Sequence, residues 1–254
     1  MQFLLQSENK NIDIDVLLVE DVIKSASCGI NYLYSSILDM QNVDKLDEYI
    51  PVGSLEFVHK WLNLVYGIKN INPIEIPDVL RTFEFLKRKY KIVKASDVPK
   101  KGRYFIKDVS VLKNFSYSGD MENFDFSLLQ NDRLYQVSEI VEIEAEYRVY
   151  IIQGKIEAIV QYDGNPLSFC DKRYIVDSGL LNKANIIYSM TEDYPNSYTM
   201  DIIVNERGTS ICEVHPFISV GLYSTLWGVN LLSAYKDGIL YAVNKNRELV
   251  EFAI

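Results

Sequence analysis

Two carboxylates on neighbouring predicted strands, Asp201 and Glu213, could together hold a divalent cation. They lie within residues 198–223, where the runs "YTMDIIV" and "TSICEVH" alternate in polarity around the turn residues "NERG", a pattern typical of a β-hairpin. We expect a three-residue loop at residues 206–208, in which Gly208 supplies the positive φ that such a loop needs. Because side chains repeat every second residue along a strand, this loop places Asp201 directly opposite Glu213.

The same loop pairs Ile203 with Ile211 and Thr199 with His215, so that His215 joins the two carboxylates on one face of the sheet. Like charges directly opposite each other destabilise a strand pair unless something separates or neutralises them. A metal ion removes this penalty, as does protonation of one carboxylate, and an exposed face on which water screens the charges is the third alternative. A change of one residue in the loop would move the two carboxylates to opposite faces and remove the argument.

Two basic side chains lie in the middle of other predicted strands. Lys107 in "YFIKDV" would be costly to bury unless it meets an anion such as phosphate, although it could equally reach water from an edge strand. Arg148 in "EYRVYIIQ" shares a face with Glu146 and suits bidentate binding of phosphate or carboxylate. A solvent-exposed ladder of polar side chains is the alternative for Arg148.

The elements that must position these residues fall into two parts, so we expect an α+β protein. Residues 1–95 alternate strand-like and helix-like patterns, among them a strand at residues 14–19 and a helix at residues 76–90, and form an α/β lobe. The polar segment "SDVPKKGR" follows, and residues 96–254 form a mostly antiparallel β lobe with flanking helices. Nucleotide-dependent enzymes often bind their ligand in the crevice between two such lobes.

Composition narrows the class of protein. The net charge of −9 over 254 residues argues against a nucleic-acid partner, since no concentrated basic patch is present. The N-terminus lacks the pattern of a signal peptide and no apolar run is long enough to span a bilayer, so we expect a cytoplasmic protein with no membrane partner. The three cysteines have no metal-ligand spacing, and the two histidines, His59 and His215, are too few for a multi-histidine zinc site.

The order of several short motifs resembles a known family. The motifs are "YFIKD", "YQVSEIV", "EYRVYIIQGKIEAIVQYDG", "YTMDIIV" and "CEVHPFISVGLY", and "YIPVGSLEFVHKWL" upstream extends the likeness over most of the chain. Together they resemble a divergent ATP-grasp clade, the one that includes a eukaryotic cell-division-cycle protein that assists assembly of a translation initiation factor. The resemblance implies an ATP-grasp fold with the nucleotide bound between the two lobes.

The resemblance also implies roles for individual residues. Lys107 and Arg148 would contact the nucleotide phosphates, with Glu146 next to Arg148, and Asp201 and Glu213 would carry Mg²⁺. The expected hinge, whose backbone reads the adenine edge, comprises Gln136, Val137, Ser138, Glu139, Ile140 and Val141. One position departs from the pattern, because many ATP-grasp proteins have asparagine where this chain has His215. An imidazole is a poorer ligand for Mg²⁺ than an amide oxygen, so His215 either lies just outside the metal shell, or the site accepts Mn²⁺, or the site is weakened.

The activity implied by the resemblance is that of an ATP-dependent carboxylate–amine ligase. A substrate carboxylate would attack ATP to give an acyl phosphate, which an amine then opens, and the acceptor could be a peptide or protein side chain. The alternative is an ATP-binding assembly factor without ligase turnover. A protein with an empty cleft and a purely structural or inhibitory role is the third possibility.

Overall fold

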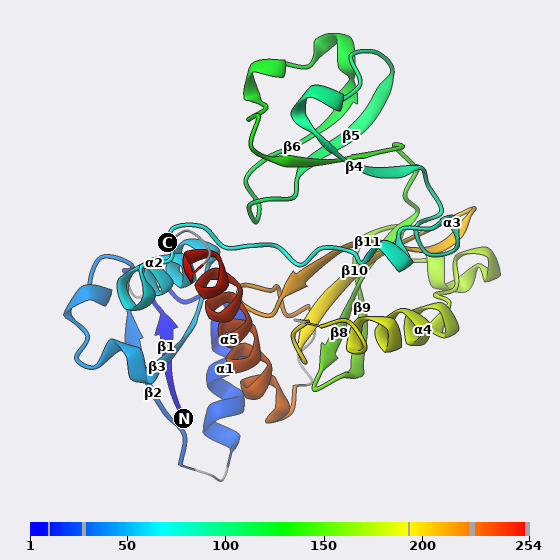
Figure 1. The fold of residues 1–254 in the computed structure, drawn as a ribbon. Coiled ribbons are helices and arrows are strands. Elements are labelled where there is room, and N and C mark those ends of the chain that lie inside the picture. The colour runs from blue at the N-terminus through cyan, green and yellow to red at the C-terminus, as the bar shows by residue number, and fades with distance from the viewer. Residues whose placement is uncertain (10, 27–28, 193, 224–226, 252–254) are drawn as a thin grey trace.

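Three β-sheets organise the chain in the computed structural model, which describes all residues except 10, 27–28, 193, 224–226 and 252–254. One sheet is parallel and lies near the N-terminus, and the other two are antiparallel. Figure 1 shows the first antiparallel sheet standing apart from the rest of the molecule, above the second. Among the residues that the structure describes, no helix is long and apolar enough to cross a membrane.

The N-terminal sheet has the strand order β2-β1-β3 and is built from β1 (Gln2–Gln6), β2 (Asn31–Ser35) and β3 (Tyr49–Val52). Helices α1 (Ile14–Ser25) and α2 (Leu55–Tyr66) follow β1 and β3. The side chain of Asp13 caps α1, and Ser54 caps α2, each accepting a backbone N–H of the first turn. The expected strand at residues 14–19 is therefore wrong, because this N-cap and the buried face of Val16, Val19 and Ile23 produce a helix instead.

The first antiparallel sheet has the order β4-β7-β5-β6. It comprises β4 (Tyr90–Lys94), β5 (Arg103–Asp108), β6 (Ser116–Asp120) and β7 (Leu134–Ser138). Its small core includes Ile106, Met121 and Tyr135. The division of the chain at residue 95 stays a prediction, but β4 pairs with β7, which favours a boundary before β4.

The second antiparallel sheet has the order β11-β10-β8-β9. It comprises β8 (Ala145–Ile152), β9 (Lys155–Gly164), β10 (Tyr198–Asn205) and β11 (Gly208–Pro216). One face packs against α4 (Ser178–Ser189) and the short helix α3 (Phe83–Leu86), so only four of residues 76–90 form an α-helix. The longer helix predicted there is wrong, since Ile76 and Leu80 pack into this core in a non-α-helical segment.

The C-terminal helix α5 (Asn230–Glu251) joins the second antiparallel sheet to the N-terminal sheet. Its residues Leu231 and Tyr235 pack with Tyr150 of β8 and with Phe3 of β1 in one apolar cluster. In Figure 1, α5 runs beside α1, and the two helices lie between these two sheets. The packing fixes the N-terminal sheet relative to the strands that carry Arg148, Asp201 and Glu213.

Candidate nucleotide and metal site

The hairpin of β10 and β11 has a tighter turn than the sequence predicts. Asn205 pairs with Gly208, so the turn has two central residues, Glu206 and Arg207, and the expected three-residue loop is wrong. Gly208 does adopt a positive φ of 91°, as predicted. With this turn alone, Asp201 and Glu213 would fall on opposite faces of the sheet.

A β-bulge restores the predicted face. Ile202 pairs with Ile211, not Ile203, yet the next pair is Asp201 with Glu213, so Cys212 is the extra residue on β11. Thr199 pairs with His215, so both pairings that define the candidate site are confirmed. The bulge offsets the one-residue difference in the turn.

Asp201 is almost fully buried and carries a bidentate ion pair with Arg148 of the neighbouring strand β8. Arg148 Nε and a terminal guanidinium nitrogen each donate to Asp201 at 2.7 Å, and the two residues are register partners. Burial alone would lower the pKa of Arg148, but the hydrogen bonds and charge of Asp201 outweigh burial and raise it. The alternative of Arg148 in a solvent-exposed ladder is wrong, because only 12% of its side chain is exposed.

Glu213 is contacted from both antiparallel sheets. Lys107 of β5 donates to one carboxylate oxygen, and His215 Nε2 lies 2.7 Å from the other. Burial alone would raise the pKa of Glu213, but hydrogen bonding to His215 and the charges of His215 and Lys107 lower it below its usual range. Lys107 therefore meets an anion, although in this structure that anion is a carboxylate.

The two carboxylates tolerate each other because cationic side chains lie around them. Among the described residues, Asp201, Glu213 and His215 form a group whose ligand atoms all lie within 4.8 Å of one another, which is compact enough for one metal ion. Two carboxylates suit Mg²⁺ or Mn²⁺, while the imidazole favours the softer ion. His215 Nε2 is 3.9 Å from Asp201 Oδ2, and its buried Nδ1 has no hydrogen-bond partner in the part of the chain that is described.

Two tyrosines that the sequence gave no reason to select cover Arg148. The rings of Tyr162 and Tyr223 stack with centroids 5.0 Å apart, and Arg148 Cζ lies 5.4 Å from the first ring centroid and 5.3 Å from the second. The Tyr162 hydroxyl donates to Glu146 on β8. Tyr162 lies near the end of β9 and Tyr223 lies beyond β11, so no local spacing relates them to Arg148.

The expected hinge connects the two antiparallel sheets. Gln136 and Ser138 are buried at the end of β7, and the backbone N–H of Glu139 donates to the Lys89 carbonyl at 2.9 Å. The Glu139 carboxylate pairs with Arg207 of the hairpin turn at 2.8 Å. A role for Gln136 to Val141 in binding adenine stays a prediction, and among these six residues Gln136 lines the cavity between the two sheets.

Two small cavities flank the carboxylates. One, of about 30 Å³, lies between the sheets and is lined by Lys107, Gln136, Glu213 and His215. The other, of about 130 Å³, is lined by Arg148, His215 and Tyr223 on the side of the N-terminal sheet. Pockets for drug-sized ligands span roughly 300–1,000 Å³, so a nucleotide needs more room than either cavity offers.

Comparison with known proteins supports the family resemblance. A family model described as an ATP-grasp domain, family 2 of its clade, matches residues 85–226, more than half of the chain. The macrocyclase MdnC from Microcystis aeruginosa MRC, solved with its precursor peptide MdnA, is 13% identical, with 94% of this chain and 99% of that chain covered and a TM-score of 0.52. The D-alanine–D-alanine ligase from Bacillus anthracis, solved with ATP, is 11% identical, covers 96% and 98% of the two chains and has a TM-score of 0.48. A comparison with the curated proteins gives no match.

The chain belongs to the ATP-grasp family that this model describes. Its fold is the ATP-grasp fold predicted from the motifs, an α+β arrangement of helices and antiparallel sheets. The similar solved structures include ligases, and MdnC is among them as a protein bound to a peptide. At 13% identity that likeness concerns the fold.

Proposed function

We propose that the protein is an ATP-dependent carboxylate–amine ligase that forms an acyl phosphate. One observation carries this proposal: a lysine from one antiparallel sheet and an arginine from the other converge on two adjacent carboxylates, beside the cavity between the sheets. Cations for phosphate and carboxylates for a divalent metal are the groups that phosphoryl transfer needs. Membership in an ATP-grasp family supports the same assignment.

An exchange of ionic partners would prepare the site for ATP. Lys107 and Arg148 neutralise Glu213 and Asp201 in the structure, and ATP with Mg²⁺ or Mn²⁺ offers each of these groups a new partner of opposite charge. Lys107 and Arg148 would then bind phosphate oxygens, while Asp201 and Glu213, with His215 beside them, would hold the metal. When bound, the metal ion would neutralise phosphate charge and favour transfer of the phosphoryl group.

Nucleotide entry would require the two antiparallel sheets to separate. The cavity between them holds only about 30 Å³. The segment from Gln136 to Val141 joins β7 to the second sheet, so small backbone rotations there would move the first sheet as a unit. Such an opening would break the Lys107–Glu213 contact, which is the only ion pair between these two sheets among those of the described residues.

The reaction would proceed in two steps. The substrate carboxylate attacks the γ-phosphorus, ADP leaves, and an acyl phosphate forms. An amine then attacks the acyl carbon, and inorganic phosphate leaves as the amide forms. MdnC is bound to a precursor peptide, which supports testing peptide side chains as well as small molecules as substrates.

An ATP-binding assembly factor without turnover is the alternative function. His215 favours it, because this histidine occupies a position where the resembled pattern has asparagine and its imidazole lies within 2.7 Å of Glu213. The assembly factor would bind ATP with metal but would release neither ADP nor an acyl phosphate.

Hydroxylamine trapping tests the two functions, because it converts an acyl phosphate into a stable hydroxamate. The full chain is incubated with ATP, Mg²⁺ or Mn²⁺, hydroxylamine and a mixture of amino acids and short peptides as carboxylates, and ADP and hydroxamate are measured. We expect both products from the wild type and a loss of roughly 10²-fold or more in Lys107→Met. The control Lys91→Met, an exposed lysine on the same sheet, should leave the rate unchanged. ATP binding without ADP release would contradict the ligase and favour the assembly factor.

A further inference from the structure

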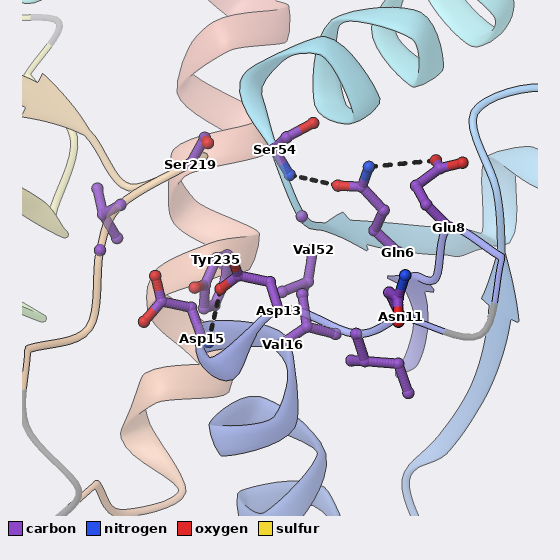
Figure 2. Close-up of a pocket in the computed structure, with 14 residues that line it drawn as sticks. Gln6, Glu8, Asn11, Asp13, Asp15, Val16, Val52, Ser54, Ser219 and Tyr235 are labelled. Carbon is purple, nitrogen blue, oxygen red and sulfur yellow. Dashed lines mark hydrogen bonds between the residues drawn. The ribbon is translucent and has the colours of Figure 1, made fainter.

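The largest described cavity against the N-terminal sheet lies outside the candidate nucleotide site. It has a volume of about 540 Å³, within the range of ligand pockets. Its floor is the carboxyl end of the parallel strands, where Gln6 ends β1 and Val52 ends β3, and the first turn of α1 forms another wall (Figure 2). In open α/β sheets, the carboxyl ends of parallel strands are the usual place for a ligand.

The charged groups that line this pocket are all acidic. Glu8, Asp13 and Asp15 contribute carboxylates, and no described lining residue is a lysine, arginine or histidine. Each carboxylate has neutral donors: Glu8 accepts from the backbone of Ile37, Asp13 from the backbone of Asp15, and Asp15 from the backbone of Leu222. These donors fix the carboxylates in place but leave their negative charge without a cationic partner among the described residues. The pocket therefore favours a cation.

A buried tyrosine whose hydroxyl lacks a partner lies in the same wall. Tyr235 of α5 is 2% exposed and lines the pocket together with Asp13 and Asp15 (Figure 2), yet its hydroxyl has no hydrogen bond to any described residue. Burial, together with the charges of Asp15 and Asp13, raises the pKa of Tyr235, so the hydroxyl stays neutral. A buried polar group without a partner is costly, and a ligand with hydrogen-bonding groups would satisfy it.

The pocket adjoins the candidate nucleotide site. The segment Ser219 to Gly221 lines both this pocket and the cavity beside Arg148, and the Tyr150 hydroxyl donates to the Gly221 carbonyl at 2.5 Å. Asp15 is also close enough for the charge of Arg148 to lower its pKa, against the larger effect of burial. A molecule held by Asp15 would thus lie next to the place where the phosphates are expected.

We propose that this pocket binds the primary alkylammonium group of the acceptor amine, through the carboxylates of Asp13 and Asp15 and the hydroxyl of Tyr235. This inference rests on the proposed ligase function and specifies its amine substrate. An ammonium group has three N–H donors, one for each of these oxygens. The amine is either a free diamine or the side chain of a lysine in a peptide, both of which carry this group on an alkyl chain.

The step that this pocket would serve balances without another reactant. The amine first loses one proton to Asp15, and its lone pair then forms the C–N bond with the acyl carbon. The C–O bond to phosphorus-bound oxygen breaks, and phosphate leaves with that electron pair. The second proton that the nitrogen loses goes to phosphate, which departs as hydrogen phosphate, and Asp15 returns its proton to solvent.

Calorimetric titration of the full chain, without ATP, tests the inference directly. The probes are 1,4-diaminobutane for a free diamine, Nα-acetyl-lysine methylamide for a peptide lysine, and 1,4-butanediol as the uncharged control. We expect one or both amines to bind and the diol to show no binding. The arm that binds more tightly identifies the source of the amine, whereas no binding of either amine at millimolar concentration overturns the inference.

Variants of matched shape assign the binding to these residues. Asp15→Asn and Asp13→Asn remove the charge, while asparagine keeps the helix cap at position 13, and each should weaken amine binding by roughly 10-fold or more. Tyr235→Phe should weaken it by a smaller factor. The control Asp21→Asn alters an exposed residue of the same helix and should bind as the wild type does. Equal affinity of Asp15→Asn and the wild type would overturn the assignment.

The two proposals can fail separately. Asp201→Asn should lose its response to ATP with metal but keep amine binding, because Asp201 does not line this pocket. Hydroxamate formation by a wild type that binds no amine would refute only the amine pocket. Amine binding by a protein that never releases ADP would refute only the ligase.

Discussion

Carboxylates in two regions of the molecule meet opposite electrostatic conditions. On β10 and β11, Asp201 is paired with Arg148 and Glu213 with Lys107 and His215, so the sheet neutralises its own acidic groups. At the start of α1, Asp13 and Asp15 have neutral donors and no cation among the described residues. The first region is arranged to exchange partners with a bound anion and metal together, whereas the second is arranged to receive a cation. The contrast predicts effects of opposite sign when the two regions are altered.

The largest expected effect is the loss of the buried ion pair. Arg148→Ala leaves Asp201 buried without its partner and should lower the free energy of unfolding by about 3–5 kcal/mol, measured by urea denaturation. The control is Arg173→Ala, which breaks a surface pair with Asp171 and should change stability far less. If the two variants lost similar amounts, the description of Arg148 and Asp201 as a buried, mutually dependent pair would be wrong.

A smaller effect of opposite sign is expected from Asp15→Asn. Burial is the largest influence on Asp15, and together with the charge of Asp13 it raises the pKa above the ordinary 3.8, although the Leu222 hydrogen bond and Arg148 act against it. The folded protein thus holds this proton more tightly than the unfolded chain, and stability is lost as pH rises through the folded pKa.

Asp15→Asn should therefore melt at a higher temperature than the wild type at pH 7. The difference should disappear below pH 3.8, where Asp15 is protonated in both states. A series of thermal melts across this pH range provides the measurement. A lower melting temperature for the variant at pH 7 would show that Asp15 stabilises the fold and is not held ready for a ligand.

The sequence predicted the candidate site better than it predicted the hairpin that forms it. The pairing of Asp201 with Glu213 was right, but two local errors cancelled: the turn is one residue shorter, and the bulge at Cys212 adds that residue back. Cys212 continues the alternating pattern of "TSICEVH", so nothing in the spacing marks it as a bulge. The partnership of Arg148 with Asp201 depends on the register of β8 against β10, which local patterns leave undetermined because the strands are far apart in sequence.

The acidic pocket was missed because one of its elements was misassigned. Asp15 was taken as part of a strand, since the apolar run at residues 14–19 fits either a strand or a buried helix. Asp13, just before that run, and Asp15 in the first turn are the signal that would have predicted a helix start. Tyr235 joins the pocket from α5, more than 200 residues later, and only the packing of α5 against α1 brings it there.

The central claim, that ATP and metal together replace the internal ion pairs, is tested most directly by thermal shift. The wild type and Asp201→Asn are melted with ATP alone, with Mg²⁺ or Mn²⁺ alone, and with both. A ligand at 100 times its dissociation constant adds about 2.7 kcal/mol, which amounts to a shift of several degrees. We predict a shift with ATP and metal together that exceeds the sum of the separate shifts, because phosphates release the carboxylates to the metal, and its loss in Asp201→Asn. No shift of the wild type with both ligands, or the same shift in the variant, would contradict the account.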